Sequence, residues 1–502
     1  MQGYEIQDLQ EWNDKVRASA EGFGLKCFPQ DFEICDSEQM ISFMAYSGMP
    51  SHYPHWSYGK QFEIQKTFHD YGVSGLPYEM VINADPCIAY LMRDNTLLLQ
   101  ILTMAHVYGH NDFFKNNATF RHIRPELVVE TFKVHADRIR SYIADPSIGL
   151  EKVEKVLDAA HALSLQCRRN LDSPKLTKAR LEERLRDKFF GHCDEDESKG
   201  LKKRPEFDAD GFEKARVKIP LESDEDILLF IRDENKSLSE WERDILTIVH
   251  EEAQYFIPQI DTKIMNEGWA SFWHKKIIEA LDLPQGKKIE FGVRHSQVLA
   301  PNPGGLNPYH LGFRVWTNLE KMYDEALAGK ISEENQMEYD RNGEPGDLRK
   351  GKSGLQKIFE VREAFRDTSF IQSFLTENLM RDMGLFEHEF IKDKKTRIVT
   401  KVSDRDEWKD IRNTLVRNVG MGNIPVIKVE DANHQDHPRR LLLKHYYDGR
   451  ELEFNYAKET LKHVKFLWGN EVTLESFVTQ PGYQGPMYCW VNDKDELPWK
   501  RK

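Results

Sequence analysis

The chain has 502 residues, 40% of them hydrophobic and 11% aromatic, a composition typical of a globular protein of two or three domains. Its formal charge of −13, from 83 acidic and 70 basic residues, argues against a general nucleic-acid or anionic-membrane surface. The start shows no signal-peptide pattern, no uncharged run is long enough to span a membrane, and six scattered cysteines form no CxxC pair. We therefore expect a reduced, cytoplasmic protein that binds no nucleic acid and spans no membrane.

Residues 1–192 are expected to form an N-terminal helical module, because long stretches combine helix-forming residues with heptad-like apolar spacing. Residues 193–211 mix blocks of both charges with Gly and Pro, which predicts a solvated connector. A second helical block, residues 212–388, is expected to pack with the first module and to complete a site between them.

The predicted secondary structure changes after residue 392, where short β-rich segments surround a helical pattern. Apolar runs at 441–447 and 451–456 flank Asp448-Gly449-Arg450, which predicts a hairpin. Residues 392–502 are therefore expected to form a C-terminal α+β domain. The predicted fold class is mainly α, with a large helical core of the kind that can house a catalytic site and this small domain at the end.

His106 and His110 lie four residues apart in an almost continuously apolar segment that is predicted to be a helix from about Thr96. Two buried imidazoles on one helical face can ligate a divalent ion while neutral, as in the H-E-x-x-H motif. Val107 stands where that motif has its Glu, so a general base has to come from elsewhere. Two core histidines that are satisfied by hydrogen bonds are the alternative.

Glu267 is a single carboxylate in the tryptophan-rich segment 266–274, where an ionised side chain needs a positive or protonated partner. His274 follows two helical turns later and shares its face if 263–278 is one helix. Glu267 is therefore the expected third metal ligand. A carboxylate that accepts hydrogen bonds from a tryptophan or a helix N-terminus is the alternative.

Three further residues are candidates for catalysis. Glu252 falls inside the apolar stripe of a predicted helix, where it could activate water or form a structural ion pair with a buried Arg. Tyr309 and His310 follow a Gly/Pro-rich loop and could stabilise an oxyanion, or form an ordinary loop pair.

The chain resembles the SpoVR family, the stage V sporulation protein R proteins and their relatives in non-sporulating bacteria. Long signatures in one order carry the resemblance: His52–Lys60, Asn83–Met92, Ala105–Asn117, Arg243–Phe256, Pro258–His274 and Asn307–Gly312.

The resemblance implies a cytoplasmic bacterial protein, linked in spore formers to cortex peptidoglycan assembly and in other bacteria to stationary-phase or stress physiology. It also implies two partners, a serine protein kinase and a von Willebrand-type protein. The arrangement of His106, His110 and Glu267 is similar to the ligand set of gluzincin metallopeptidases.

The leading hypothesis is a hydrolase that binds one zinc ion per chain, uses no nucleotide cofactor, and acts on a peptide or amide bond of a peptide or muropeptide. Its ligands would be His106, His110 and Glu267, with Glu252 activating water and Tyr309 or His310 stabilising the oxyanion. The rival hypothesis is a catalytically silent regulatory or scaffold protein that acts through protein partners. Bound metal discriminates the two.

Overall fold

Tertiary contacts divide the chain into two compact units. Unit 1 contains residues 1–138 and 255–423, and unit 2 contains residues 139–254 and 424–502, so the boundary falls within α5 (Val128–Ala144) and α10 (Glu240–Asp261). The computed structural model describes residues 4–73, 75–169, 175–189, 209–301, 305–331, 351–391, 396–402, 407–434, 439–480, 483–491 and 499–501.

These two units do not coincide with the domain ranges expected from the sequence. Each unit is built from two separate stretches, because helices far apart in the sequence pack together, and composition along the chain does not report such packing. Of the expected connector 193–211, the described residues include the last three, which begin α8 (Ala209–Arg216); the rest lies outside them.

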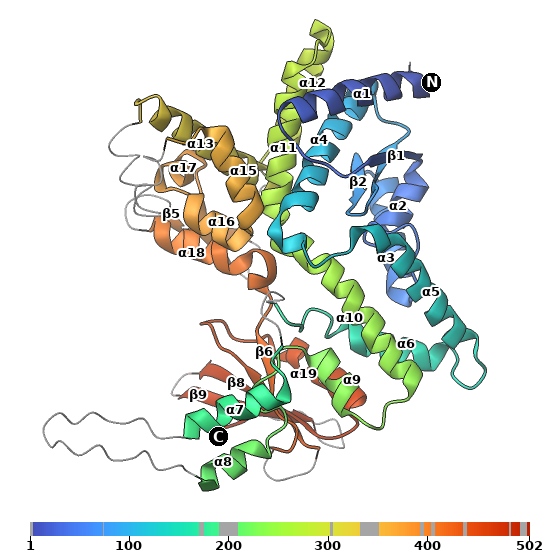
Figure 1. Cartoon of the computed structure of the whole chain (residues 1–502), viewed down its shortest axis with the longest axis vertical. Helices are drawn as coiled ribbons and strands as arrows, with labels where there is room; N and C mark the ends of the chain where they lie inside the picture. Colours follow the sequence, from blue (N-terminus) through green and yellow to red (C-terminus); the bar gives the residue numbers. More distant parts are fainter. Residues whose placement is uncertain are drawn as a thin grey trace, which may run out of the picture. The chain divides into compact units, whose positions relative to one another are not determined.

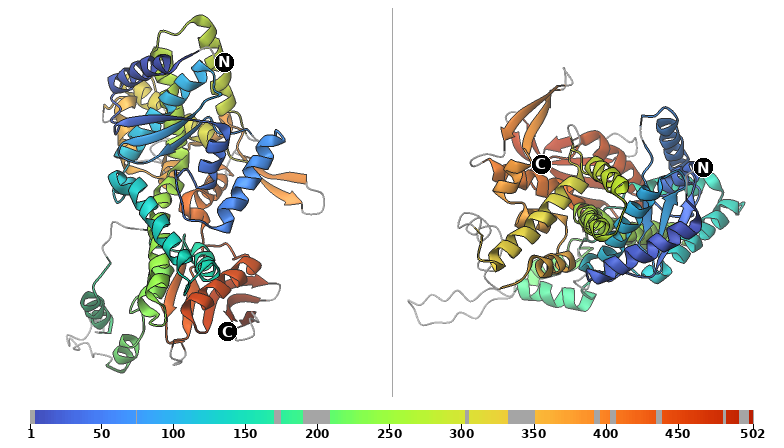
Figure 2. Two further views of the ribbon diagram at one scale, coloured as in Figure 1. Left: turned by 90° about the vertical axis from the view of Figure 1, so that its right-hand side faces the viewer. Right: turned by 90° about the horizontal axis from the view of Figure 1, so that it is seen from above.

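Unit 1 is mainly helical, as predicted (Figure 1). Besides its parts of α5 and α10, its helices are α1 (Ile6–Gly22), α2 (Ser37–Ala45), α3 (Trp56–Asp70), α4 (Leu97–Asn116), α11 (Lys263–Ala280), α12 (Gln285–Val298), α13 (Pro308–Leu327), α15 (Gly354–Ala364), α16 (Asp367–Phe374), α17 (Glu377–Asp382) and α18 (Trp408–Asn418). A hairpin of β4 (Phe386–Ile391) and β5 (Thr396–Val402) projects from these helices (Figure 2).

Unit 1 also contains a three-stranded sheet that the sequence analysis did not predict. Its order is β1 (Gln30–Cys35), β3 (Cys87–Met92), β2 (Glu79–Ile82), with β1 parallel and β2 antiparallel to β3. β2 packs against α4. β2 has only four residues, too few for a clear period-two pattern, and the apolar run Cys87–Met92 of β3 shows no alternation with polar residues.

Helix α11 packs closely against both α4 and α13 of unit 1; α4 and α11 lie side by side in Figure 1. Glycines allow the close approach: a Cβ added to Gly109 of α4 would lie 2.6 Å from Cα of Ala270 on α11, and one added to Gly268 would collide with the backbone of Gly312 on α13. Tryptophans 269, 273 and 316 are fully buried around this contact. The three helices are therefore fixed at short range.

The ends of these helices are capped. Thr96 accepts a hydrogen bond from the backbone N–H of Leu99 and begins α4 where it was predicted. At the start of α11, the buried Asp367 carboxylate accepts from the N–H groups of Ile264 and Met265 at 2.8 and 2.9 Å. Asn307 caps α13 by accepting from the N–H of Tyr309.

Unit 2 contains the predicted C-terminal α+β structure. Its helices are α6 (Leu150–His161), α7 (Lys178–Phe189), α8, α9 (Ile227–Glu234) and α19 (Phe454–Trp468), together with its part of α10. The strands form one sheet in the order β10 (Trp499–Arg501), β9 (Tyr483–Val491), β8 (Val472–Gln480), β7 (Leu441–His445), β6 (Ile427–Asp431).

The hairpin predicted at 441–456 is wrong. The second run forms the start of α19, which lies on the sheet and joins the parallel strands β7 and β8 (Figure 2). Glu453 caps this helix, and Leu461, Val464 and Leu467 form its buried stripe. Burial of that stripe outweighs the turn signal of Asp448-Gly449-Arg450.

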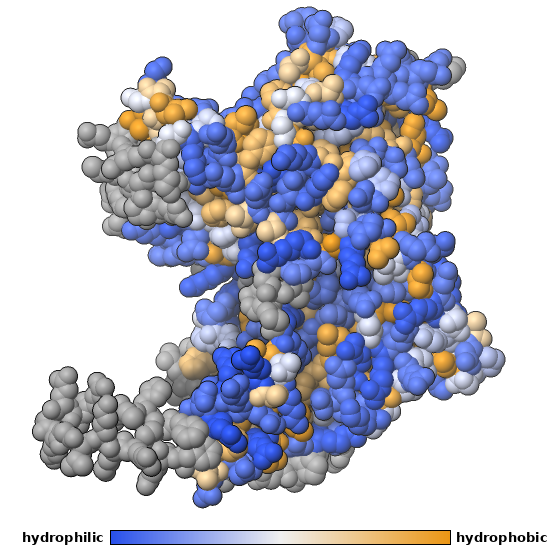
Figure 3. All heavy atoms as spheres, viewed as in Figure 1, coloured by the Kyte–Doolittle hydropathy of each residue, from blue (hydrophilic) through white to orange (hydrophobic). Residues whose placement is uncertain are grey.

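Hydrophilic residues cover most of the face seen in Figure 3, with hydrophobic residues scattered between them. Within the described ranges, no helix has both the length and the apolar character needed to cross a bilayer.

Candidate metal centre

His106 and His110 occupy one face of α4, four residues apart, and both are buried. Nδ1 of His110 lies 2.8 Å from Oδ1 of Asn266. Because an amide oxygen only accepts, this contact places the ring proton of His110 on Nδ1 and leaves Nε2 as a lone-pair donor for a cation. The asparagine thus fixes the tautomer that a metal ligand needs.

Glu267 of α11 faces the same two rings. Its Oε2 atom lies 3.4 Å from Nε2 of His110 and 3.7 Å from Nε2 of His106. The structure therefore brings together the three residues that the sequence analysis selected as ligands, although Glu267 follows His110 by 157 positions in the sequence (267 − 110).

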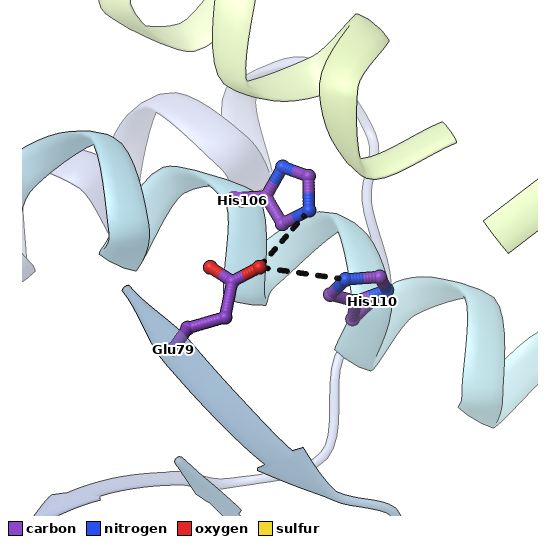
Figure 4. A group of neighbouring side chains, drawn as sticks. All are labelled: Glu79, His106 and His110. Carbon is purple, nitrogen blue, oxygen red and sulfur yellow. Dashed lines mark ion pairs between the residues drawn. The ribbon is translucent and has the colours of Figure 1, made fainter. Parts of the chain in front are cut away.

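A second carboxylate, Glu79, reaches the same point from the first residue of β2 (Figure 4). Its Oε1 atom lies 3.2 Å from Nε2 of His106 and 4.0 Å from Nε2 of His110. One ligand atom each of Glu79, His106 and His110 lies within 4.8 Å of the others, a spacing that could hold a metal ion.

Several potential metal-ligand atoms at this point are buried and make no hydrogen bond. Oε2 of Glu79, Oε2 of Glu267 and Nε2 of His106 have no hydrogen-bond partner among the described residues. Buried polar groups are almost always satisfied. Oε2 of Glu267 and Oε1 of Glu79 approach Nε2 of His106 to 3.7 and 3.2 Å, where a cation would accept their lone pairs. The donor set of two imidazoles and two carboxylates therefore fits a divalent ion.

The electrostatics of the site agree with this fit. Burial lowers the pKa of His106 to about 4, so its imidazole is neutral and free to ligate at neutral pH. Burial also raises the pKa of Glu79 well above its ordinary range, and the Glu267 carboxylate beside it acts in the same direction. Burial alone would raise the pKa of Glu267, but the adjacent His106 and His110 outweigh it and hold that pKa well below the ordinary value.

A chain of three imidazoles extends from the site. Nδ1 of His106 lies 2.9 Å from Nδ1 of His274, and Nε2 of His274 lies 2.7 Å from Nδ1 of His295, which is partly exposed. If His106 ligates through Nε2, its Nδ1–H donates to His274, whose Nε2–H in turn donates to His295. Ligation thus sets the direction of every hydrogen bond in the chain.

The catalytic candidates take different places. The ring of Tyr309 stacks on His106 at a centroid distance of 6.0 Å, and its hydroxyl donates a hydrogen bond to the Glu267 carboxylate. Tyr309 also lines a cavity of about 500 Å³ that reaches Glu79, Glu267 and His110. His310 is partly buried, and neither it nor Glu252, which lies in unit 2, is among the residues lining that cavity. Their catalytic roles stay predictions.

Comparison with known proteins identifies the family. Residues 3–424 match the family model described as SpoVR like protein, and residues 425–479 match the SpoVR-like C-terminal domain. This chain belongs to the SpoVR family. The first SpoVR match ends at the residue after unit 1 ends, so the C-terminal domain match lies wholly within unit 2.

A SpoVR relative of similar length is the uncharacterized protein YcgB of Escherichia coli strain K12. It is 33% identical over 477 residues, which cover 90% of this chain and 88% of YcgB. No solved structure matches this SpoVR chain.

Glu79 is a residue of this cluster that sequence reasoning missed. The available signal was weak: one carboxylate in the otherwise apolar run Tyr78-Glu79-Met80-Val81-Ile82. The same reasoning that selected Glu267, a lone charge among apolar neighbours, applies to Glu79. Unlike Glu267, Glu79 has no cluster of tryptophans or histidines beside it in the sequence to mark it.

Proposed function

We propose that this SpoVR chain is a metal-dependent hydrolase that cleaves a peptide or amide bond, with zinc as the ion. The observation that carries the proposal is the convergence of His106, His110, Glu267 and Glu79, with orphaned donor atoms, at the wall of a 500 Å³ cavity. A structural zinc site is closed, whereas a catalytic site keeps an open position beside its protein ligands.

In this proposal His106, His110 and Glu267 hold the ion. Glu267 suits the role of ligand because its Oε2 atom lies at nearly equal distances from both imidazoles. When bound, a divalent ion polarises the scissile carbonyl and lowers the pKa of a water molecule beside it.

Glu79 replaces Glu252 as the proposed general base. Its Oε1 atom lies 3.2 Å from Nε2 of His106, and the residue lines the cavity. Glu79 would supply the carboxylate that the H-E-x-x-H motif has at the position occupied here by Val107. Its carboxylate would take a proton from the attacking water and return it to the leaving amine. The Tyr309 hydroxyl would then donate to the oxyanion that forms on the carbonyl oxygen.

The test is hydrolysis of a panel of peptides and muropeptides by the zinc-loaded full chain. We expect cleavage by the wild type, and a rate at least about a hundredfold lower for Glu79→Gln with the ion retained. Glu63→Gln, which changes an exposed carboxylate of α3, is the matched control and should keep the wild-type rate. Loss of the ion in Glu79→Gln would make Glu79 a ligand and contradict its role as base.

One observation favours the rival function of a silent regulatory or scaffold protein: the motif position for a glutamate is occupied by the fully buried Val107. Under this proposal the chain acts through partners such as a kinase or a von Willebrand-type protein, in the cytoplasm, and its histidines form a structural network. Partner capture that survives His106→Asn and His110→Asn, in a chain without stoichiometric metal, would support it.

A further inference from the structure

The cavity beside the metal centre has a chemically divided wall. Along α10 and α11, residues Phe256, Ile260, Lys263 and Glu267 recur at intervals of three or four and all line it. Met80, Val81 and Phe114 add further apolar surface to the same cavity. A ligand in this space would meet this apolar surface beside the polar side chains of Gln259 and Asn266 and the charge of Lys263.

Lys263 is the lysine among the residues that line this cavity, and no ion pair involving it is found in the described part of the chain. Its neighbours Glu79 and Glu267 carry two negative charges when both are ionised, which a divalent ion would balance. The ammonium group of Lys263, whose side chain is exposed, then leaves one positive charge over beside the site. The loaded site would therefore attract an anionic ligand.

The position of Lys263 also limits where that anionic group can lie. It precedes Glu267 by four residues on α11, a rise of about 6 Å along the helix. An extended peptide advances about 3.3–3.6 Å per residue. An anion held by Lys263 would thus lie within one or two residues of the bond presented to the ion.

We propose that the cavity binds an acyl amino acid or peptide end in which a free carboxylate pairs with Lys263 and an apolar side chain contacts Phe256 and Ile260. This inference rests on the proposed metallohydrolase function and names its substrate class. Lys263, four residues before Glu267 and in the same cavity as the apolar Phe256 and Ile260, carries it. Lys263 is a specificity residue in this account and takes no part in the chemical step.

Calorimetric titration of the zinc-loaded full chain tests the inference with two probes. Benzylsuccinate carries one carboxylate for the ion, a second for Lys263 and a ring for the apolar wall, whereas 3-phenylpropionate lacks the second carboxylate. We expect benzylsuccinate to bind at least about tenfold more tightly, as one charge-assisted pair allows. Lys263→Met should remove this preference and Lys263→Arg should keep it.

Lys288→Met, on the exposed start of α12, is the matched control and should behave as the wild type. If Lys263→Met keeps the preference for benzylsuccinate, or the wild type shows none, the proposed substrate class is wrong. Zinc bound in the same samples would show that the metal site itself is not contradicted. Zinc is measured before each titration. A chain that holds no zinc would overturn the metal site and this inference with it.

Discussion

At the scale of single residues, His106 joins two networks. Its Nε2 atom faces Glu79 and Glu267, and its Nδ1 atom faces His274. A histidine ligand is oriented by the group on its other nitrogen, and loss of such a group typically costs about 10–100-fold in metal affinity. The outer imidazoles therefore influence metal binding although they lie outside the ligand set.

His295 provides the test of this chain. Replacement by Phe keeps an aromatic ring but removes the acceptor for His274, so we expect zinc affinity to fall by about tenfold. Replacement by Gln supplies an amide oxygen and should restore much of the affinity. Competition with a chromogenic chelator measures both. Equal zinc affinity in His295→Phe and the wild type would show that the chain does not act on the ligand.

Most residues of this site could be selected from the sequence, because a local pattern marks each of them. His106, His110 and Glu267 are each marked by polarity within an apolar helix, and helical periodicity places them. Glu79 sits at the start of a four-residue strand, where no period can be read. Its approach to His106 depends on tertiary packing of β2 against α4, which the sequence does not display.

At the scale of elements, the site depends on how closely α4 and α11 approach. Gly109 lies beside His110 at the point where α4 meets Ala270 of α11. A side chain there pushes the two helices apart, and interiors accommodate added volume poorly. The distance between His110 and Glu267 is therefore tied to this glycine.

We expect Gly109→Ala to destabilise the chain by about 1–3 kcal/mol and to weaken zinc binding. Gly292→Ala is the matched control, because Gly292 lies in α12 with open space around its missing Cβ. That change should be neutral or stabilise by up to about 1 kcal/mol. Urea denaturation and zinc titration of both variants measure the effects, and a Gly109→Ala variant as stable as Gly292→Ala would contradict the close approach.

Long helices were predictable and short strands were not. The almost continuously apolar run after Thr96 predicts the start of α4, which the structure confirms. Residues 263–278 lie in one helix, α11, which is the condition under which Glu267 and His274 share a face. Residues 441–456 show the opposite case, since their turn signal is local while the burial that makes α19 a helix comes from the sheet. Tertiary burial overrides local turn preference there.

At the scale of the whole molecule, buried neutral histidines couple stability to pH. His106 and His295 have pKa values lowered to about 4, chiefly by burial, whereas an unfolded histidine has an ordinary value near 6.5. Between these values the unfolded state binds more protons than the folded state, so stability falls as the pH drops through this window.

We expect the free energy of unfolding of the metal-free protein to fall by about 2 kcal/mol between about pH 7 and about pH 5 because of His106 alone. His106→Asn should reduce the pH dependence by that amount, and His69→Asn, on α3, should leave it unchanged. Urea midpoints followed by tryptophan fluorescence measure the effect. A pH dependence that is identical in the wild type and His106→Asn would contradict a buried neutral imidazole.

The central claim is that unit 1 holds a divalent ion, and metal content tests it most directly. Plasma mass spectrometry of the purified, tag-free chain after zinc reconstitution and dialysis should give about one ion per wild-type chain. His110→Ala and Glu267→Gln should lose it, and Glu63→Gln should keep it. A wild-type chain that retains no ion, or variants that bind as much as the wild type, would contradict the account.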